Sequence, residues 1–227
     1  MTPEDFGALW LSFKLGAVTT AVLLVIGTPI ALWLSRSRSI LRPVVEAITA
    51  LPLVLPPTVL GFYLLLLFSP LSPFGSTWVQ VTGSSLAFSF TGLVIASVIY
   101  SLPFMVQPLS AAFSAVGSKP LEAAASLRAG PFDRFLTVLS PLALRGYLTA
   151  AVLTFAHTIG EFGVVLMIGG GIPGRTRVVS VAIYENVETQ RFADAHALSL
   201  VLIAFSFLIL VAVYSLNRKF PVSVGHS

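Results

Sequence analysis

The longest charge-free stretch of this chain most limits how it can fold. The 72 residues from Ala47 to Ser118 contain no Asp, Glu, Lys or Arg. A water-soluble domain carries about 25% charged residues, whereas this chain carries only 10%. A charge at the centre of a bilayer costs at least ~2.5 kcal/mol, so charge-free segments are typical of lipid-embedded helices. The sequence therefore predicts an all-α integral membrane protein.

Five segments are apolar for long enough to cross a bilayer, which takes about 20 residues per helix. The expected spans are Leu15–Leu34, Val44–Phe68, Leu86–Phe113, Gly146–Gly169 and Leu198–Leu216. An amphipathic entry, Phe6–Lys14, precedes the first. We expect no cleaved signal peptide, because this first apolar run is too long and its leader is acidic. With no linker, internal repeat or appended soluble domain visible, we expect a single transmembrane domain over residues 1–227.

Lys and Arg divide unequally between the two sides that five spans define. One side has Arg36, Arg38, Arg42, Lys119, Arg128, Arg134, Arg145, Arg218 and Lys219, and the other has Lys14, Arg175, Arg177 and Arg191. Loops rich in Lys and Arg stay in the cytoplasm, so the N-terminus is expected outside and the C-terminus inside. This bias accounts for the net charge of +4 without a nucleic-acid partner. The chain has no cysteine, which excludes disulfides and thiolate metal sites.

Several prolines lie inside the apolar segments, most densely in Leu51–Thr58, which reads LPLVLPPT. Proline kinks a membrane helix and frees carbonyl groups that must be buried in protein or face a cavity. This segment is either a packing kink or a flexible wall of a pathway. Between spans, we expect a short outside loop at Ser69–Ser85 and a re-entrant or interfacial helix at Val178–Asn186.

Residues 117–145, between the third and fourth spans, form a compact charged island. Ser118 is a candidate N-cap, Pro120 suits the first turn of a helix, and three alanines favour helix. The pair Gly130-Pro131 is expected to end this helix, which we place at Lys119–Gly130. A short rigid helix with small side chains suits a groove in a soluble partner. The alternative is an ordinary cytoplasmic loop that happens to be helical.

The island resembles the EAA loop found in permease subunits of binding-protein-dependent ABC importers. The matching residues are Glu122, Ala123, Ala124, Val138 and Pro141, which follows the glutamate by nineteen residues. Two positions depart, because Arg128 stands where such loops usually have Gly and Ser140 where they usually have Leu. We expect Gly130 to replace the missing glycine as the helix end.

Further segments are similar to molybdate permeases. These are Leu51–Gly61, Gly160–Gly163 and Ile172–Arg177, within a five-span layout from Trp10 to Leu216. The resemblance implies a type I ABC importer permease of the bacterial inner membrane that carries molybdate, and also tungstate. It implies three partners besides lipid: a cytoplasmic ABC ATPase dimer, a periplasmic or lipid-anchored molybdate-binding protein and a second copy of the chain. A sulfate or thiosulfate permease is the nearest alternative.

The chain lacks the Gly-x4-Gly-Lys-Ser/Thr sequence of an ATP-binding loop, so we expect a transport subunit and not an enzyme. Neither a cofactor nor a metal is expected. A solitary secondary transporter or channel remains a rival, although such proteins usually show inverted repeats and coupling ion sites. A membrane enzyme is a weaker option, because no cluster of acids or metal ligands is visible.

The pathway candidates are polar residues within expected spans: Glu161, His157, Thr58, Ser101 and Thr154. An intramembrane carboxylate is a functional hypothesis by default. Because His157 and Glu161 are four residues apart, they could form a buried hydrogen-bonded pair that locks the helix, or line a gate. Each hydroxyl could instead bond back to its own helix. At the outer mouth, Arg175 and Arg177 could pair with acidic residues of a docked binding protein, draw in an anion or simply be solvated.

Overall fold

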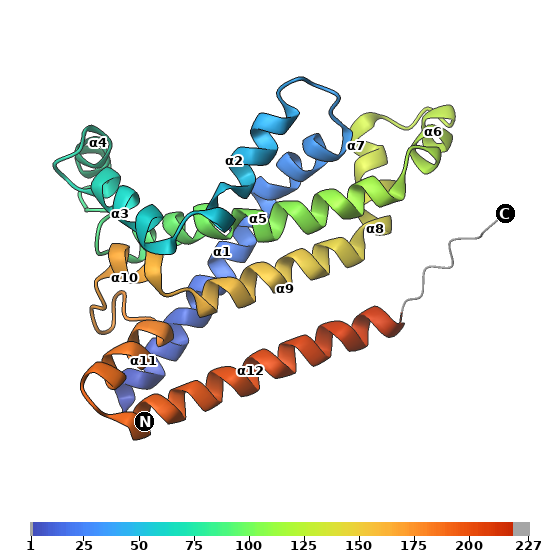
Figure 1. Ribbon diagram of the computed structural model, residues 1–227. Coiled ribbons are helices and arrows are strands. Elements are labelled where there is room, and N and C mark those ends of the chain that lie inside the picture. The colour runs from blue at the N-terminus through green and yellow to red at the C-terminus, as the bar shows by residue number, and fades with distance from the viewer. Residues whose placement is uncertain (1, 220–227) are drawn as a thin grey trace.

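A computed structural model describes residues 2–219, without the side chains of residues 212–214 and 216–219, so those of Arg218 and Lys219 lie outside the description. Every regular element within this range is helical (Figure 1). The elements are α1 (Pro3–Arg36), α2 (Arg42–Val54), α3 (Pro57–Phe68), α4 (Pro73–Thr82), α5 (Phe90–Val116), α6 (Lys119–Ser126), α7 (Pro131–Arg134), the π-helical turn η1 (Phe135–Leu139), α8 (Ser140–Leu142), α9 (Leu144–Gly160), α10 (Gly163–Gly169), α11 (Val179–Glu188) and α12 (Phe192–Lys219).

The all-α membrane class is confirmed. In the described part of the chain, α1, α5 and α12 are each long and apolar enough to cross a membrane. Two bent helix pairs bring the number of candidate spans to as many as five. The first and fifth expected spans lie within α1 and α12. Most of the third lies within α5, which begins at Phe90 after an N-cap at Ser89 that accepts the Gly92 N–H.

The second expected span, Val44–Phe68, is not a single helix. It breaks after Val54, and α2 and α3 meet at a bend of 108°. Pro56 and Pro57 cause the break, because proline has no N–H to donate and disfavours helical geometry in the residue before it. The kink expected here is therefore present, but it is a complete interruption.

The fourth expected span, Gly146–Gly169, is also interrupted. α9 ends at Gly160, Glu161 is extended with ψ at 132°, and α10 starts at Gly163. One connection also differs from expectation, and a second is helical as expected. Ser69–Ser85 contains the ten-residue helix α4 instead of a plain loop. The segment from Val178 to Asn186 becomes α11, which packs against α1 and α12 with Val179, Val181 and Ala182 buried.

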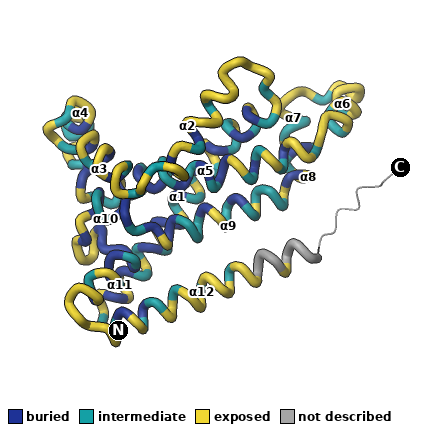
Figure 2. Tube along the Cα trace, viewed as in Figure 1, coloured by how far each residue is buried: buried dark blue, intermediate teal, exposed yellow. Residues whose placement is uncertain are grey.

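The helices α1, α5 and α9 form the centre of the molecule (Figure 1). Close approach depends on small residues: a Cβ on Gly27 of α1 would meet the Cγ of Met105 in α5 at 2.8 Å. Gly146 of α9 lies still closer to the side chain of Ala112. By contrast, α12 lies along one side and is largely exposed (Figure 2). Its outward apolar residues, such as Phe207, are suited to lipid.

The connections gather at two opposite ends of this bundle. The turn between α1 and α2 lies at the same end as α6 and α7, whereas α4, α10, α11 and the start of α1 lie at the other (Figure 1). Arg38, Lys119 and Arg128 are therefore at one end, and Arg175 and Arg191 at the other. The fold thus keeps the two charge groups apart, as the division of Lys and Arg predicts.

Candidate functional site: an exposed helix at one end and a polar cavity at the helix breaks

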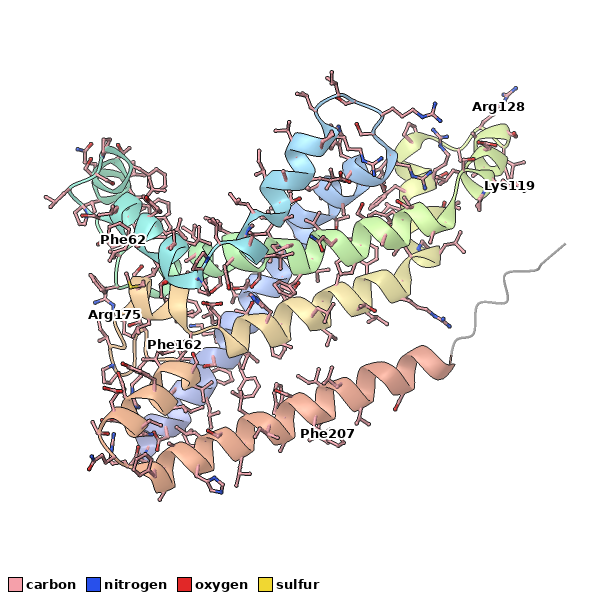
Figure 3. The ribbon with its side chains drawn as sticks, viewed as in Figure 1. Phe62, Lys119, Arg128, Phe162, Arg175 and Phe207 are labelled. Atoms are coloured by element: carbon pink, nitrogen blue, oxygen red, sulfur yellow. The ribbon has the colours of Figure 1, made fainter. Side chains whose placement is uncertain are left out.

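The helix α6 projects from the bundle and touches its core through the partly buried Leu121. None of its residues is buried, and Glu122 lies exposed in its first turn. Ser118 occupies the N-cap position, but only its backbone carbonyl takes part, by accepting the Glu122 N–H at 2.9 Å. In Figure 3, the side chains of Lys119 and Arg128 mark the two ends of this helix at the tip of the molecule. The surface is therefore available to another molecule.

The end of α6 differs from the expectation that Gly130 stops the helix. The helix ends at Ser126, and Arg128 takes the left-handed conformation with φ at 64°. The Arg128 N–H bonds the Ala125 carbonyl at 2.9 Å and the Ala129 N–H bonds that of Ala124 at 3.1 Å. These two bonds form a Schellman motif, which places Arg128 at the position where glycine is favoured. This geometry explains physically why EAA loops usually carry Gly there.

Replacing Arg128 by Gly is expected to stabilise the protein by about 1 kcal/mol, because glycine adopts the left-handed conformation without a Cβ clash. The measurement is thermal unfolding in detergent, followed by tryptophan fluorescence. Ala129→Gly is the matched control. Ala129 is the next residue but has a negative φ, so it gains nothing from glycine's freedom at positive φ. An unchanged or lower melting temperature for Arg128→Gly would show that the arginine side chain more than offsets the backbone strain.

The island is anchored to the bundle by its later part. Phe135 of η1 packs edge-on against Phe113 of α5, with ring centroids 6.3 Å apart, and Leu139 is buried in the same cluster. Arg36 at the end of α1 donates to the Phe113 carbonyl at 3.3 Å. Pro141, the last EAA-like position, is exposed in α8. Movement of α6 would therefore be transmitted to the ends of α1 and α5.

A second feature is a cavity of about 520 Å³ at the two helix breaks, one between α2 and α3 and the other between α9 and α10; its lining is mostly apolar and includes a few polar side chains. It is lined by Pro57, Thr58, Tyr100, Ala156, His157, Gly160, Glu161, Phe162 and Gly163. The prolines after α2 and the break after α9 meet here, since Pro57 and Gly163 are in close contact. Freed backbone at membrane depth is tolerated where it lines a cavity. Residues far apart in the sequence thus line one cavity, in which Thr58, Tyr100, His157 and Glu161 are the polar side chains.

Glu161 lies at the break and not inside a helix. Its Oε1 accepts the Val164 N–H at 2.8 Å, and its backbone carbonyl accepts the Ser180 hydroxyl at 2.6 Å. The carboxylate therefore caps the first turn of α10, where the helix dipole favours negative charge. No hydrogen bond joins Glu161 to His157 in the described structure. The expected locked pair is not formed, although both residues line the cavity.

His157 is held by α5 instead. Its Nδ1 lies 3.0 Å from the Ser101 hydroxyl, and its ring lies between those of Phe104 and Tyr100, at centroid distances of 3.8 and 5.0 Å. Neither aromatic residue was singled out from the sequence. The only sequence feature that could have indicated them is their spacing of four residues on an apolar helix. That spacing is also typical of ordinary core packing.

The three hydroxyl candidates have different environments. Thr58 is exposed and lines the cavity, while Ser101 is buried behind His157. Thr154 is fully buried and does not line the cavity, and its hydroxyl has no hydrogen-bond partner. Among the described residues, no group of three His, Asp or Glu side chains is placed to hold a metal ion.

The two arginines of the expected outer mouth separate. Arg175 is exposed and lines a cavity formed by the end of α3, the turn after it and the connection that precedes α5. Arg177 is only 5% exposed, and its Nε donates to Glu185 Oε2 at 2.6 Å. Its Nη1 also lies 3.8 Å from Asp5 Oδ1. The expectation that Arg177 faces a docked protein or solvent is therefore wrong, because its charge is satisfied within the chain.

Comparison with known proteins gives a consistent result. The family model described as "Binding-protein-dependent transport system inner membrane component" matches residues 24–221. A "Molybdenum transport system permease protein ModB" from Azotobacter vinelandii is 55% identical over 99% of both chains. A "Probable sulfate transport system permease protein cysT" from Nephroselmis olivacea is 32% identical over 79% of this chain and 64% of its own. The fold is similar to a chain of the inward-facing MetNI methionine ABC transporter (TM-score 0.72, 19% identity, 96% and 99% coverage).

Proposed function

Because this chain belongs to the family of binding-protein-dependent transport system inner membrane components, we propose that it is the membrane-spanning permease subunit of an ATP-driven molybdate importer. The assignment of molybdate as the cargo rests on the greater sequence identity to the molybdenum permease of Azotobacter vinelandii. That match extends over nearly the whole of both chains. The sulfate permease is less similar and is matched over less of its length. Tungstate is the other expected cargo, since it is a tetrahedral oxyanion of the same kind.

The cavity at the helix breaks is the proposed passage. Its volume of about 520 Å³ has room for a tetrahedral oxyanion. No Lys or Arg lines it, so an anion meets hydroxyl groups, backbone dipoles and an imidazole in place of a fixed cation. A transporter must release its cargo, and a weakly binding passage favours release. Selectivity is then expected to lie mainly in the separate binding protein.

The exposed helix α6 is the proposed attachment for a cytoplasmic ABC ATPase. Its exposure, its anchoring to α1 and α5 through Phe113 and its EAA-like residues support this role. Two copies of the permease would each insert α6 into one ATPase subunit. Closure of the ATPase dimer on ATP would pull the two helices together and turn the passage outward, and hydrolysis would reset it. With this attachment, α6 would face the cytoplasm, in agreement with the expected orientation.

The opposite end of the molecule is the proposed docking side for a periplasmic or lipid-anchored binding protein. Arg175 is exposed there and could pair with an acidic residue of that protein. The exposed apolar side chains of α12, such as Phe207, suit contact with lipid (Figure 3).

The test uses proteoliposomes that contain this chain, its ATPase and its binding protein. ATP hydrolysis and anion uptake are compared with molybdate, tungstate or sulfate on the binding protein. We expect stimulation by molybdate and tungstate and none by sulfate. Stimulation by sulfate alone would change the cargo and keep the mechanism. Uptake without any bound ATPase would favour a solitary transporter instead.

A further inference from the structure

A one-way chain of hydrogen bonds determines which nitrogen of His157 carries the proton. The Thr158 hydroxyl lies 2.8 Å from the Thr154 carbonyl, which can only accept, so Thr158 donates. Ser101 lies 3.0 Å from the Thr158 hydroxyl, whose hydrogen is already used, so Ser101 donates to it. Ser101 Oγ, 3.0 Å from His157 Nδ1, must therefore accept from an Nδ1–H. The neutral imidazole is thereby fixed with its proton on Nδ1.

The alternative tautomer is disfavoured by the same chain. With the proton on Nε2, Ser101 would have to donate to Nδ1, and the Ser101–Thr158 contact would lose its hydrogen. Both hydroxyls are buried, at 1% and 2% exposure, so no solvent would replace the lost bond. Packing between Phe104 and Tyr100 also holds the ring in place. His157 therefore presents Nε2, which has no hydrogen bond in the described structure, as an acceptor.

The other residues that line the cavity determine how the Nε2 acceptor would affect a bound anion. The titratable groups that line it with His157 are Tyr100 from α5 and Glu161 beyond α9. From α3 come only Pro57 and Thr58, α10 adds only Gly163, and no lining residue comes from α1. A fully deprotonated tetrahedral oxyanion offers only acceptor oxygens. It would meet the lone pair of Nε2 and the negative charge of Glu161, and both repel it.

We propose that this cavity is a proton-dependent oxyanion subsite, in which the anion binds together with one proton taken up at His157 Nε2. The inference rests on the proposed function and adds the binding chemistry. One proton turns the Nε2 acceptor into a donor and adds a positive charge that offsets that of Glu161. The anion in turn stabilises the imidazolium, so each favours the binding of the other. The proton comes from water and returns to it when the anion leaves, and no covalent bond changes.

The experiment measures molybdate uptake per ATP hydrolysed in the same reconstituted complex, from about pH 6 to about pH 8, the range in which a histidine changes charge. Because protons are taken up with the anion, wild-type uptake is expected to fall about tenfold as the pH rises. His157→Arg supplies a permanent cation and should keep its uptake at high pH, with a flat profile. His196→Arg is the matched control on the exposed side of α12 and should keep the wild-type profile.

A second variant tests whether Ser101 acts by fixing the proton on His157 Nδ1 or only by supporting the packing of the helices. Ser101→Ala removes the acceptor that holds the proton on Nδ1, so the neutral ring can offer an N–H to the anion. Its pH profile is expected to be shallower than that of the wild type, even if uptake is lower. A flat wild-type profile with active uptake would overturn the subsite and leave the permease proposal intact. Uptake of sulfate with no molybdate uptake at any pH would overturn the proposed cargo. Sulfate uptake that falls as the pH rises would then support the proton-dependent subsite, and a flat sulfate profile would overturn it.

Discussion

Replacing Glu122 by Lys is expected to abolish ATP-driven uptake and binding of the ATPase subunit, while the permease stays folded in the membrane. Glu122 is exposed and α6 buries none of its residues, so the substitution removes no packing. A lysine in the first turn opposes the helix dipole at a cost of only about 0.3–1 kcal/mol. At a docking surface, however, it reverses a charge that faces the partner, and like charges there cost several kcal/mol.

The measurement is co-purification of the ATPase in detergent, followed by uptake in proteoliposomes, and we expect a loss of at least about tenfold in each. Glu188→Lys is the matched control. Glu188 is also an exposed glutamate in a short helix, but it lies at the end of α11, on the opposite side of the molecule (Figure 1). If Glu122→Lys retains both the ATPase and uptake, α6 does not dock the ATPase.

Replacing Arg177 by Met is expected to cause the largest loss of stability, about 3–5 kcal/mol, because it leaves a buried carboxylate without its cation. Asp5 is 2% exposed; its Oδ1 faces Arg177, and its Oδ2 accepts the Thr2 N–H at 2.7 Å. Glu185, which is partly exposed, also loses its 2.6 Å bond. These contacts join the start of α1 to α11, so this end of the bundle should loosen first.

Thermal unfolding in detergent measures this effect, and Arg175→Met is the matched control. Arg175 is two residues away and exposed, and the described structure gives it no ion pair, so we expect its melting temperature to stay near that of the wild type. Adding Asp5→Asn to Arg177→Met should recover part of the loss, because the uncompensated charge is then removed. Equal melting temperatures for Arg177→Met and Arg175→Met would contradict the buried ion-pair interpretation.

Much of the fold could be predicted from local chemistry. The absence of charge from Ala47 to Ser118 indicates lipid, whatever the helix packing, because an unpaired charge is costly anywhere in the hydrocarbon region. The prolines of Leu51–Thr58 indicate a kink, because a missing N–H is a property of the residue itself. The helical island at 117–145 follows in the same way from its alanines and its first-turn proline, although its end point does not.

The contacts at the candidate sites could not be predicted in this way. His157 and Glu161 are four residues apart, yet the helix ends between them and each bonds elsewhere, His157 to a hydroxyl 56 positions away in the chain. Arg177 and Arg175 are the same residue type in the same loop, so the sequence does not distinguish them. The packing of α11 on α1 buries only Arg177. Sequence alone thus determined the membrane class, the kink at Leu51–Thr58 and the helical island, since these depend on solvation and backbone chemistry, whereas the break after Gly160 appears only in the structure. Tertiary structure alone decided the partners of the buried polar groups, since a desolvated donor or charge must bond to whatever the packing brings near.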